Sequence, residues 1–341
     1  MNNKSKVKIW VALVALLLVT VASLNYVIDP LWIRSHSNAF NNKQPVFNER
    51  QQKTNKLFFG GMEQYDALML GSSRGAMFNQ NDFEGMKLFN YSTNNMAPWE
   101  YAGWLDVAKK IKGSDFKEVV IAIDFFGTQS HLDEDAKDPE RQPQSYLTRA
   151  QDGSYPYRSL VSLDTAKNAF KGLMKILRSP GVEFYNRANV KFAQKVSAEQ
   201  REKYIQWNIE DHQKDFGKAY KYKEDWIDLL QDLKAKNPKT HFTLITTPVS
   251  QQWFSEFVEP NHLIDYKRWL TETVWVFGEV HHFMDMNSVT KNIDNFFDAH
   301  HVYQNITQMM AKKATGVTNS SPEDFGVLLT PENIEGYLSK F

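Results

Sequence analysis

Residues 65–75 read Tyr65-Asp-Ala-Leu-Met-Leu-Gly-Ser-Ser-Arg-Gly75. The apolar run 67–70 breaks into a glycine and two serines, which predicts a buried strand that ends in a tight turn before a helix. Such a turn presents the hydroxyl of Ser73 at the end of the strand, where the N–H groups that open the next helix favour negative charge. The alternative is that the small residues only fill the turn. Ser73 is therefore a candidate nucleophile, and its partners must come from elsewhere in the chain.

A second short motif, Asp298-Ala-His-His301, lies near the other end of the chain, at the start of what we expect to be the last helix. A serine becomes a nucleophile when a base takes its proton, and a third group must fix the tautomer of that base. His301 is the candidate base, and Asp298, one helical turn earlier, is the candidate orienting group. The alternative is that Asp298 caps the helix and that both histidines are exposed polar residues.

The chain between these motifs alternates short apolar runs with helical stretches. Apolar runs separated by helices are typical of a parallel sheet that is buried on both faces, so the expected fold class is α/β. The expected strands are Ala67–Leu70, Lys87–Tyr91, Glu118–Phe125, His241–Thr247 and His282–Met286.

Helical periodicity predicts helices at Pro98–Ile111, Thr165–Leu177, Ala198–Asp211, Lys223–Lys234, His262–Val276 and Tyr303–Ala314. More than a hundred residues, 127–240, separate the third strand from the fourth, and a single crossover needs far fewer. We expect this insertion to form a helical cap, with a polar surface loop at Ser130–Asp152.

The N-terminus carries the one long apolar run, 7–22, with Lys4, Lys6 and Lys8 at or before its start. A helix over Ile9–Val27 is close to bilayer length, and the lysines place its N-terminus in the cytoplasm. The alternative is a cleaved signal peptide, for which residues 21–23 offer a poor cleavage site. We expect a cytoplasmic stub and membrane anchor at 1–28, a lead-in segment without regular structure at 29–60, and a domain outside the cytoplasm at 61–341.

Composition excludes some classes of function. Lysine plus arginine number 40 and aspartate plus glutamate number 40, so the chain lacks the basic surplus that nucleic-acid binding requires. The 23 phenylalanines, 14 tyrosines and 9 tryptophans indicate a folded domain. His281, His282, Asp285, Asp298, His300 and His301 could be assembled into a metal site, but they lack a helix-borne ligand spacing. We therefore expect neither a metal nor a cofactor.

The order Ser…Asp…His, with the Gly71-Ser72-Ser73 turn and a late Asp-x-x-His, resembles the SGNH/GDSL hydrolase superfamily. The resemblance implies a three-layer α/β/α sandwich with a five-stranded parallel sheet. In the family's Gly-Asp-Ser block the nucleophile is the third residue. That position is Ser73 here, while Ser72 occupies the Asp position and is a weaker candidate.

The same resemblance assigns an oxyanion hole. The family's second block supplies a backbone N–H from a glycine, and Asn95 stands at that position in residues 89–100. Asparagine tolerates the left-handed backbone that a glycine adopts. A backbone N–H near Arg74 is the expected second donor. The alternative for residues 89–100 is a simple turn with a helix cap.

One family feature is missing. Many SGNH hydrolases carry an asparagine after the third strand, whereas this chain reads Ile123-Asp-Phe-Phe-Gly127. In this respect it resembles the membrane-anchored proteins of exopolysaccharide O-acetylation and teichoic-acid D-alanylation. That resemblance implies acyl transfer to or from a cell-surface polysaccharide, with a multi-pass membrane acyltransferase as partner. The alternatives are a carbohydrate esterase and a non-catalytic accessory protein that binds glycan or such a partner. The insertion 127–240 lies outside the resemblance.

Overall fold

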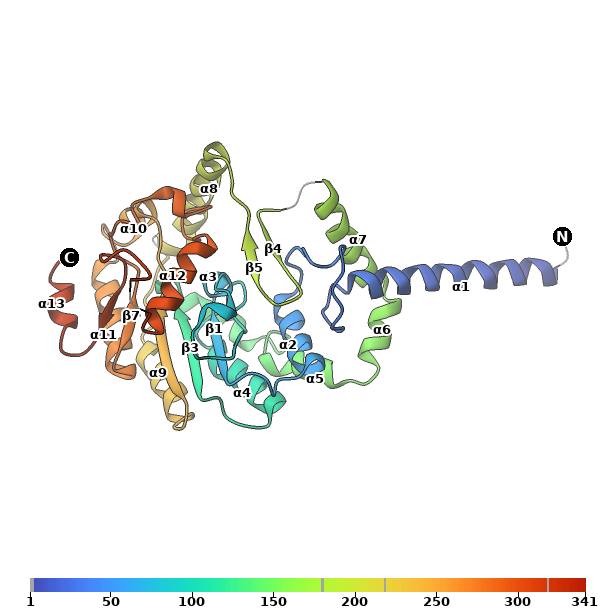
Figure 1. Cartoon of the computed structure of the whole chain (residues 1–341), viewed down its shortest axis with the longest axis horizontal. Coiled ribbons are helices and arrows are strands. Elements are labelled where there is room, and N and C mark those ends of the chain that lie inside the picture. Colours follow the sequence, from blue (N-terminus) through green and yellow to red (C-terminus); the bar gives the residue numbers. More distant parts are fainter. Residues whose placement is uncertain (1–2, 179–180, 218, 318) are drawn as a thin grey trace. The chain divides into compact units, whose positions relative to one another are not determined.

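A computed structural model describes residues 3–178, 181–217, 219–317 and 319–341, which form a mixed α/β structure around a six-stranded, mostly parallel sheet (Figure 1). The chain divides into two compact units. Unit 1 comprises residues 1–61 and 145–189, and unit 2 comprises residues 62–144 and 190–341. The sheet and all the predicted site residues belong to unit 2.

The six-stranded sheet has the order β2-β1-β3-β6-β7-β8. Its first five strands are parallel, and β8 runs antiparallel to β7. Strand β1 is buried along its whole length and β3 from Val119 onward, because helices cover a parallel sheet. The chain leaves β1 toward β2 on one side and later returns to β3 on the other. Ligands bind beyond the carboxyl ends of strands at such a reversal. The strands are β1 Ala67–Gly71, β2 Leu88–Asn90, β3 Glu118–Ile123, β6 His241–Thr246, β7 Val280–His282 and β8 Val327–Leu329.

The sheet corrects two sequence expectations. It has six strands and not five, because the short β8 adds an antiparallel edge that three residues of sequence do not reveal. Strand β7 also ends at His282, whereas the sequence placed the strand at 282–286. The reason lies in Thr246, whose hydroxyl accepts the N–H groups of Phe283 and Met284 at 2.8 and 3.3 Å and so takes them out of strand pairing.

The six expected helices are present with shifted ends. Within unit 2, α4 lies against β1, and α11 lies against β7 and α9. The other elements of unit 2 are short helices and turns that the sequence pattern did not predict, together with strand β5. The helices of unit 2 are α3 Ser73–Ala76, α4 Glu100–Lys112, α8 Ala198–Phe216, α9 Trp226–Ala235, α10 Gln251–Phe257, α11 Leu263–Phe277, α12 Gln304–Ala314 and α13 Ile334–Leu338, with β5 at Lys191–Ala193.

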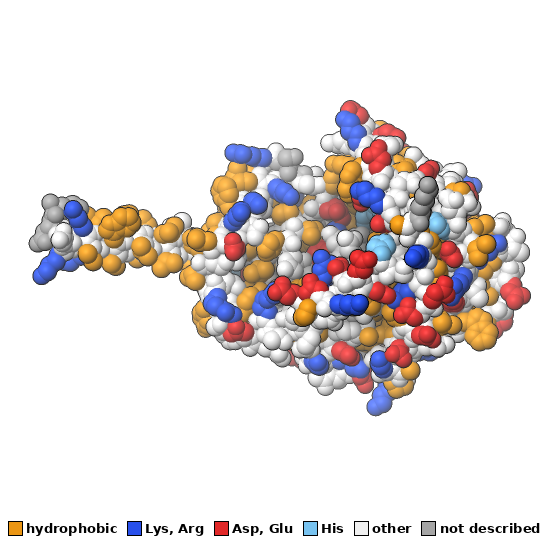
Figure 2. Space-filling view, turned by 180° about the vertical axis from the view of Figure 1, so that it is seen from behind, with side chains coloured by type: hydrophobic (Ala, Val, Ile, Leu, Met, Phe, Trp, Pro, Cys, Tyr) orange, Lys and Arg blue, Asp and Glu red, His pale blue; other side chains and the backbone are white. Residues whose placement is uncertain are grey.

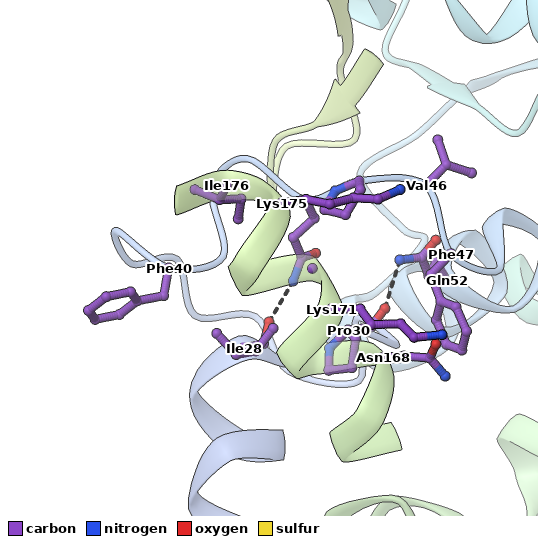
Figure 3. A pocket seen from close by; sticks show the side chains of 13 residues that line it. Ile28, Pro30, Phe40, Val46, Phe47, Gln52, Asn168, Lys171, Lys175 and Ile176 are labelled. Atoms are coloured by element: carbon purple, nitrogen blue, oxygen red, sulfur yellow. Dashed lines mark hydrogen bonds between the residues drawn. The ribbon is translucent and has the colours of Figure 1, made fainter. Parts of the chain in front are cut away.

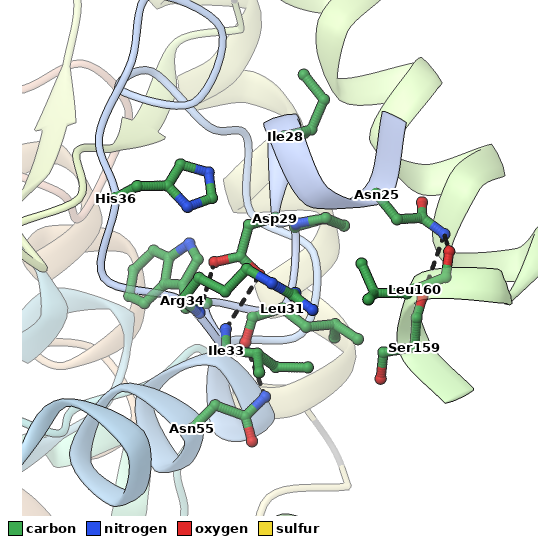
Figure 4. Close-up of polar contacts among 12 residues, drawn as sticks. Asn25, Ile28, Asp29, Leu31, Ile33, Arg34, His36, Asn55, Ser159 and Leu160 are labelled. Atoms are coloured by element: carbon green, nitrogen blue, oxygen red, sulfur yellow. Dashed lines mark hydrogen bonds and ion pairs between the residues drawn. The ribbon is translucent and has the colours of Figure 1, made fainter. Parts of the chain in front are cut away.

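Unit 1 contains the N-terminal helix α1 Asn3–Ile28, which is long and apolar enough to cross a membrane. Residues 29–60, expected to be irregular, include the helix α2 Glu49–Gly60. Its buried face is polar and so lacks an apolar period. Gln52 and Asn55 donate to the carbonyls of Pro30 and Leu31, each at 2.7 Å, as Figure 4 shows for Asn55. The remaining elements are α6 Tyr155–Val161, α7 Leu163–Arg178 and β4 Glu183–Tyr185.

The insertion between β3 and β6 is divided between the units. Residues 145–189 cluster with the N-terminal segment, and the rest clusters with the sheet. The segment Ser130–Asp152, expected to be a surface loop, contains a 3₁₀ helix at Ser130–Lys137 and the helix α5 Pro143–Gln151. Helix α5 was missed because its buried apolar residues are only Pro143, Leu147 and Ala150, too few to give a clear period.

Candidate active site

The turn after β1 carries Ser73 as the first residue of the four-residue helix α3. Two glycines allow this turn to lie close to its neighbours. A Cβ atom at Gly71 would lie 2.8 Å from the Cβ of Ala122 in β3, and one at Gly75 would lie 2.8 Å from Ser92 Oγ. The N–H of Thr93 also donates to the carbonyl of Gly71 at 3.1 Å. The turn is therefore wedged between the ends of β2 and β3.

Ser73, His301 and Asp298 are brought together by a chain of hydrogen bonds. Ser73 Oγ lies 2.8 Å from His301 Nε2, and His301 Nδ1 lies 2.7 Å from Asp298 Oδ2. Ser73 is half-buried, and only 12% of the side-chain surface of His301 is exposed. The serine hydroxyl, the imidazole and the carboxylate thus stand in the order that serine activation requires.

The Asp-x-x-His motif is not helical, in contrast to the sequence expectation. It lies in the loop before α12, and the side chain of Asp298 closes the turn. Asp298 Oδ1 accepts the backbone N–H groups of His300 and His301 at 2.9 and 2.8 Å, which leaves Oδ2 for the imidazole. One carboxylate therefore sets both the backbone of the loop and the orientation of the ring.

The pKa of Asp298 is lowered although the residue is buried. Burial alone raises the pKa of a carboxyl group, because it disfavours the charged form. The charge of His301, its hydrogen bond and the two backbone N–H groups outweigh that effect. Asp298 is accordingly a carboxylate at neutral pH and accepts from His301 Nδ1, which leaves Nε2 free to take a proton from Ser73.

Two residues outside the loop that carries His301, and one ring within it, hold this loop in place. Asn208 of α8 accepts the N–H of Ala299 at 3.1 Å, and the N–H of Ser250 donates to the Ala299 carbonyl at 3.0 Å. The ring of Phe297 stacks on the ring of His301, with centroids 5.4 Å apart and planes 9° apart. These contacts fix the imidazole before any substrate arrives.

A buried charged network lies beside the triad. Asp124, which follows β3, accepts from the hydroxyls of Ser72 and Thr247 and pairs with the guanidinium of Arg74 at 3.3 Å. Arg74 Nε also donates to the carbonyl of His300 at 3.3 Å. No motif in the sequence predicted this role for Asp124. The sequence does place this acid directly after a buried strand, at the edge of the sheet where Ser73 lies, and that position could have indicated a role in the site.

The two expected oxyanion donors, the N–H groups near Arg74 and Asn95, lie in different surroundings. The N–H of Arg74 points to Ser72 Oγ at 3.3 Å, a long hydrogen bond, so this donor is partly engaged within the turn. Asn95 lies exposed on the neighbouring turn with a left-handed φ of 52°. The adjacent Asn94 accepts from the fully buried Lys191 of β5 at 3.1 Å. Lys191 thus supports the turn that carries Asn95, and the sequence gave no sign of it.

Two further histidines lie behind His301. The ring centroid of His300 is 4.1 Å from that of His301 and 4.6 Å from that of His212. Burial, and then the charges of Arg74 and His301, lower the pKa of His212 to about 4, and burial lowers that of His300 well below its usual range. Both rings are therefore neutral at pH 7. Of the three histidines, His301 is the one whose ring nitrogen contacts Ser73.

Asp298, His300 and His301 also offer three ligand atoms within 4.8 Å of one another. Imidazole and carboxylate are common metal ligands. A cation held by these atoms would, however, compete with the hydrogen bond between Asp298 and His301. A metal site and a triad are alternative uses of the same side chains. Two of the other residues considered for a metal site are engaged elsewhere: His282 contacts Thr246 and Tyr266, and Asp285 accepts from Tyr337.

Comparison with known proteins gives little. No family model matches the chain, and no curated protein matches it. A solved structure from Streptococcus pneumonia, described provisionally as a platelet activating factor, matches over 78% of this chain and 89% of its own chain, with 10% identity and a TM-score of 0.35. A likeness of that size says nothing about function, so the site is interpreted from its own geometry.

Proposed function

We propose that the protein is a membrane-anchored, SGNH-like enzyme that uses Ser73, His301 and Asp298 for acyl transfer to or from a cell-surface polysaccharide. The observation that carries the proposal is the pair of contacts at 2.8 and 2.7 Å that links the three side chains. The order β2-β1-β3-β6-β7 of the parallel strands supports the three-layer doubly wound assignment, because Ser73 lies at the point where that order reverses.

The proposed reaction has two steps, acylation of Ser73 and transfer of the acyl group to an acceptor. His301 Nε2 takes the proton of Ser73 as its Oγ bonds to the carbonyl carbon of the donor. The tetrahedral oxyanion then expels the donor alcohol, which leaves with the proton from His301 and leaves an acyl group on Ser73. An acceptor hydroxyl next gives its proton to His301 and attacks the acyl carbon. The second tetrahedral oxyanion then expels Ser73, whose Oγ takes that proton back from His301. Asp298 stabilises the imidazolium in both steps, and backbone N–H groups near Arg74 and Asn95 hold the oxyanion.

The nature of the acceptor separates two forms of this enzyme. A sugar hydroxyl as acceptor gives an acyltransferase, and water gives a carbohydrate esterase. The resemblance to membrane-anchored proteins of polysaccharide acylation favours the sugar, with a multi-pass acyltransferase as the source of the acyl group. A non-catalytic accessory protein is the rival, and it rests on one observation: Asp124 stands where the family's oxyanion asparagine follows β3, and it is bound to Arg74.

We propose that α1 remains attached and that the domain lies outside the cytoplasm. Asn25, beyond the poor cleavage site, has its side-chain nitrogen within 3.1 Å of the carbonyls of Ser159, Leu160 and Ser162, so this end of α1 is part of unit 1 (Figure 4). A reporter enzyme fused after Phe341 should be active only outside the cytoplasm. Cytoplasmic activity of the fusion would refute the location and with it the glycan substrate.

The enzymatic proposal is tested with the full chain in two assays. Purified protein should hydrolyse a small activated ester, and cells should acylate their surface glycan. Ser73→Ala and His301→Ala should each abolish both activities, whereas Ser114→Ala, at an exposed turn of the same unit, should keep them. Retention of full glycan acylation by Ser73→Ala and His301→Ala would favour the accessory protein.

A further inference from the structure

Helix α7 of unit 1 leaves an apolar stripe uncovered. Leu163, Phe170 and Leu177 recur every seven residues, so they lie on one face of the helix. Their side chains are 65%, 55% and 66% exposed. The buried residues of the helix are small, and Gly172 among them packs against Pro45; they are Thr165, Ala166, Ala169 and Gly172. A helix that buries small residues and leaves these three large apolar side chains exposed has a surface made for contact with something else.

Basic side chains flank this stripe. Lys167, Lys171 and Lys175 recur every four residues and form an exposed row next to the apolar one, and Arg178 extends it. Asp164 is the one acidic residue of the helix. An exposed apolar stripe beside a row of lysines is typical of helices that lie in the plane of an anionic membrane surface.

The packing of α1 sets the height of α7 relative to a bilayer. Residues 3–20 of α1 are exposed, whereas Val21, Asn25 and Ile28 are buried within unit 1, where α1 packs against α6 and α7. The 20 residues from Ile9 to Ile28 rise about 30 Å, the thickness of the hydrocarbon layer. Val21, Asn25 and Ile28 fall within the last eight of these residues, so the contacts with α6 and α7 lie in the outer part of the span and at the point where α1 leaves the membrane. Figure 1 shows both helices at the inner end of α1.

The connection between α6 and α7 is fixed to this boundary. Asn25 of α1 donates to the carbonyls of Ser159, Leu160 and Ser162, and Ser162 is the single residue between the two helices. Figure 2 shows apolar and basic side chains together where the apolar rod of α1 ends. Helix α7 thus cannot leave the level of the headgroups without breaking contacts with α1.

A pocket of about 120 Å³ lies along the basic row of α7. Lys171 and Lys175 line it together with Ile28 of α1 and apolar side chains of the lead-in segment, among them Phe47 (Figure 3). Ammonium groups beside apolar walls match the chemistry of a lipid, in which a phosphate is joined to hydrocarbon.

We propose that α7 lies on the bilayer that α1 crosses, with its apolar stripe in the headgroup–acyl boundary and its lysines on the phosphates of anionic lipids. The anchor α1 brings the bilayer surface to α7, and the positive lysines match the negative charge of anionic lipids. The inference rests on the proposed anchoring by α1 and not on the acyl-transfer chemistry. It gives unit 1 a function, which is to hold the chain on the membrane surface by a second contact.

The absence of cysteine from the sequence makes a direct test possible, because a single introduced thiol can be labelled without background. The full chain in lipid nanodiscs carries a fluorophore through Phe170→Cys in α7, Leu16→Cys in the middle of α1, or Trp275→Cys in α11. All three positions are exposed, at 55%, 64% and 74%, and the last is the matched control in unit 2. Quenching by nitroxide-labelled lipid and by aqueous iodide is measured with and without phosphatidylglycerol.

The probe at position 170 should be quenched severalfold more by lipid nitroxide, and less by iodide, than the probe at position 275. The triple variant Lys167→Glu, Lys171→Glu, Lys175→Glu should lower this lipid quenching in nanodiscs that contain phosphatidylglycerol and change it little in those that lack it.

Equal lipid quenching at positions 170 and 275 would overturn the proposal. Shielding of position 170 from both quenchers would also overturn it, because a protein surface would then cover α7. If that shielding requires two copies in one nanodisc, the covering surface is a second copy of the chain. The probe at position 16 separates the two levels of inference. Lipid quenching at 16 without quenching at 170 refutes only the placement of α7, whereas none at either position refutes the anchor.

Discussion

Arg74 and Asp124 form a buried ion pair 3.3 Å long that joins the residue after Ser73 to the end of β3. The same guanidinium donates to the carbonyl of His300, the residue before His301. One side chain therefore touches both loops that carry the candidate nucleophile and base. Arg74 does not need to contact substrate to matter, and we regard it as a positioning residue.

Two substitutions of Arg74 should distinguish its effect on the orientation of the triad from its effect on the stability of the fold. Arg74→Lys keeps a positive charge beside Asp124, but a single ammonium lacks the fork that reaches Asp124 and the His300 carbonyl together. We expect kcat for ester hydrolysis to fall about tenfold with KM little changed, since about 1.4 kcal/mol of lost orientation has that effect. Arg74→Met should in addition lower the melting temperature, because it leaves a buried carboxylate without its cation.

Lys203→Met serves as the matched control, because Lys203 pairs with Glu199 on an exposed helical surface, where an ion pair contributes little. It should change neither kcat nor the melting temperature. Full activity of Arg74→Lys would show that Arg74 does not position the triad.

Asp298→Asn should uncouple the two functions of this side chain. The asparagine carbonyl can still accept the backbone N–H groups of His300 and His301, so the loop should keep its shape. Its NH₂ group, however, faces His301 Nδ1 and favours the wrong tautomer. We expect kcat to fall by roughly 10⁴, the loss that the same substitution causes in a serine protease, and His301→Ala to cost more. Circular dichroism checks the fold.

The control is Asp294→Asn in the preceding loop, whose side chain is 74% exposed. It should leave ester hydrolysis within about twofold of the wild type, a change of under 0.5 kcal/mol. Comparable losses in Asp294→Asn and Asp298→Asn would mean that the loop, and not the imidazole tautomer, is sensitive to the substitution.

Stability should fall on mild acidification. Burial lowers the pKa of His282 and, with the nearby positive charges, that of His212 to about 4 from 6.5, and it lowers the pKa of His300 as well. Between about pH 6.5 and 4 the unfolded chain binds these protons and the folded chain does not. The free energy of unfolding should therefore decrease as the pH falls from 6.5 toward 4, by up to about 1.4 kcal/mol per pH unit for each histidine.

Urea denaturation across this range measures the slope. His212→Gln keeps an acceptor for the indole N–H of Trp253 and should reduce the slope by about one proton. His131→Gln, at an exposed position, should leave it unchanged. The lowered pKa of Asp298 acts in a separate window, because its contribution is lost only as the pH falls below 3.8. Stability that increases between pH 6.5 and 4 would contradict this account.

Divalent metal should inhibit the enzyme and not activate it. Zn²⁺ bound by Asp298, His300 and His301 would replace the hydrogen bond that orients the imidazole. We expect EDTA to leave ester hydrolysis unchanged and Zn²⁺ to inhibit it reversibly. His300→Phe removes one ligand and keeps a ring against His212, so it should weaken the inhibition by about tenfold, or 1.4 kcal/mol. Loss of activity in EDTA that Zn²⁺ restores would instead indicate a metal-dependent enzyme.

The sequence predicted those parts of the fold whose burial follows a simple period. Strand β3 was visible because both faces of Val119–Ile123 are buried, which makes the run continuously apolar. Helix α2 was missed because its buried face consists of polar groups that bond to backbone carbonyls, as Gln52 and Asn55 do. An apolar period cannot report such a helix.

The site divides in the same way. Ser73, Asp298 and His301 could be named from local motifs, since each motif needs only a few adjacent residues. The turn formed by Asp298 was mistaken for helix because both conformations bring residues three apart together. The position of Asp124 directly after a buried strand was visible in the sequence, but its partners were not, because its hydrogen bond with Ser72 joins residues 52 positions apart and depends on the register of two strands.

The most direct test of the central claim is covalent labelling of the full chain with a fluorophosphonate, followed by peptide mass spectrometry. The reagent reacts with a serine that a base has activated. The account predicts a single adduct on Ser73, formed at neutral pH, absent in Ser73→Ala and strongly slowed in His301→Ala. Absence of an adduct in the wild type, or an adduct on another serine that forms equally well in Ser73→Ala, would contradict it.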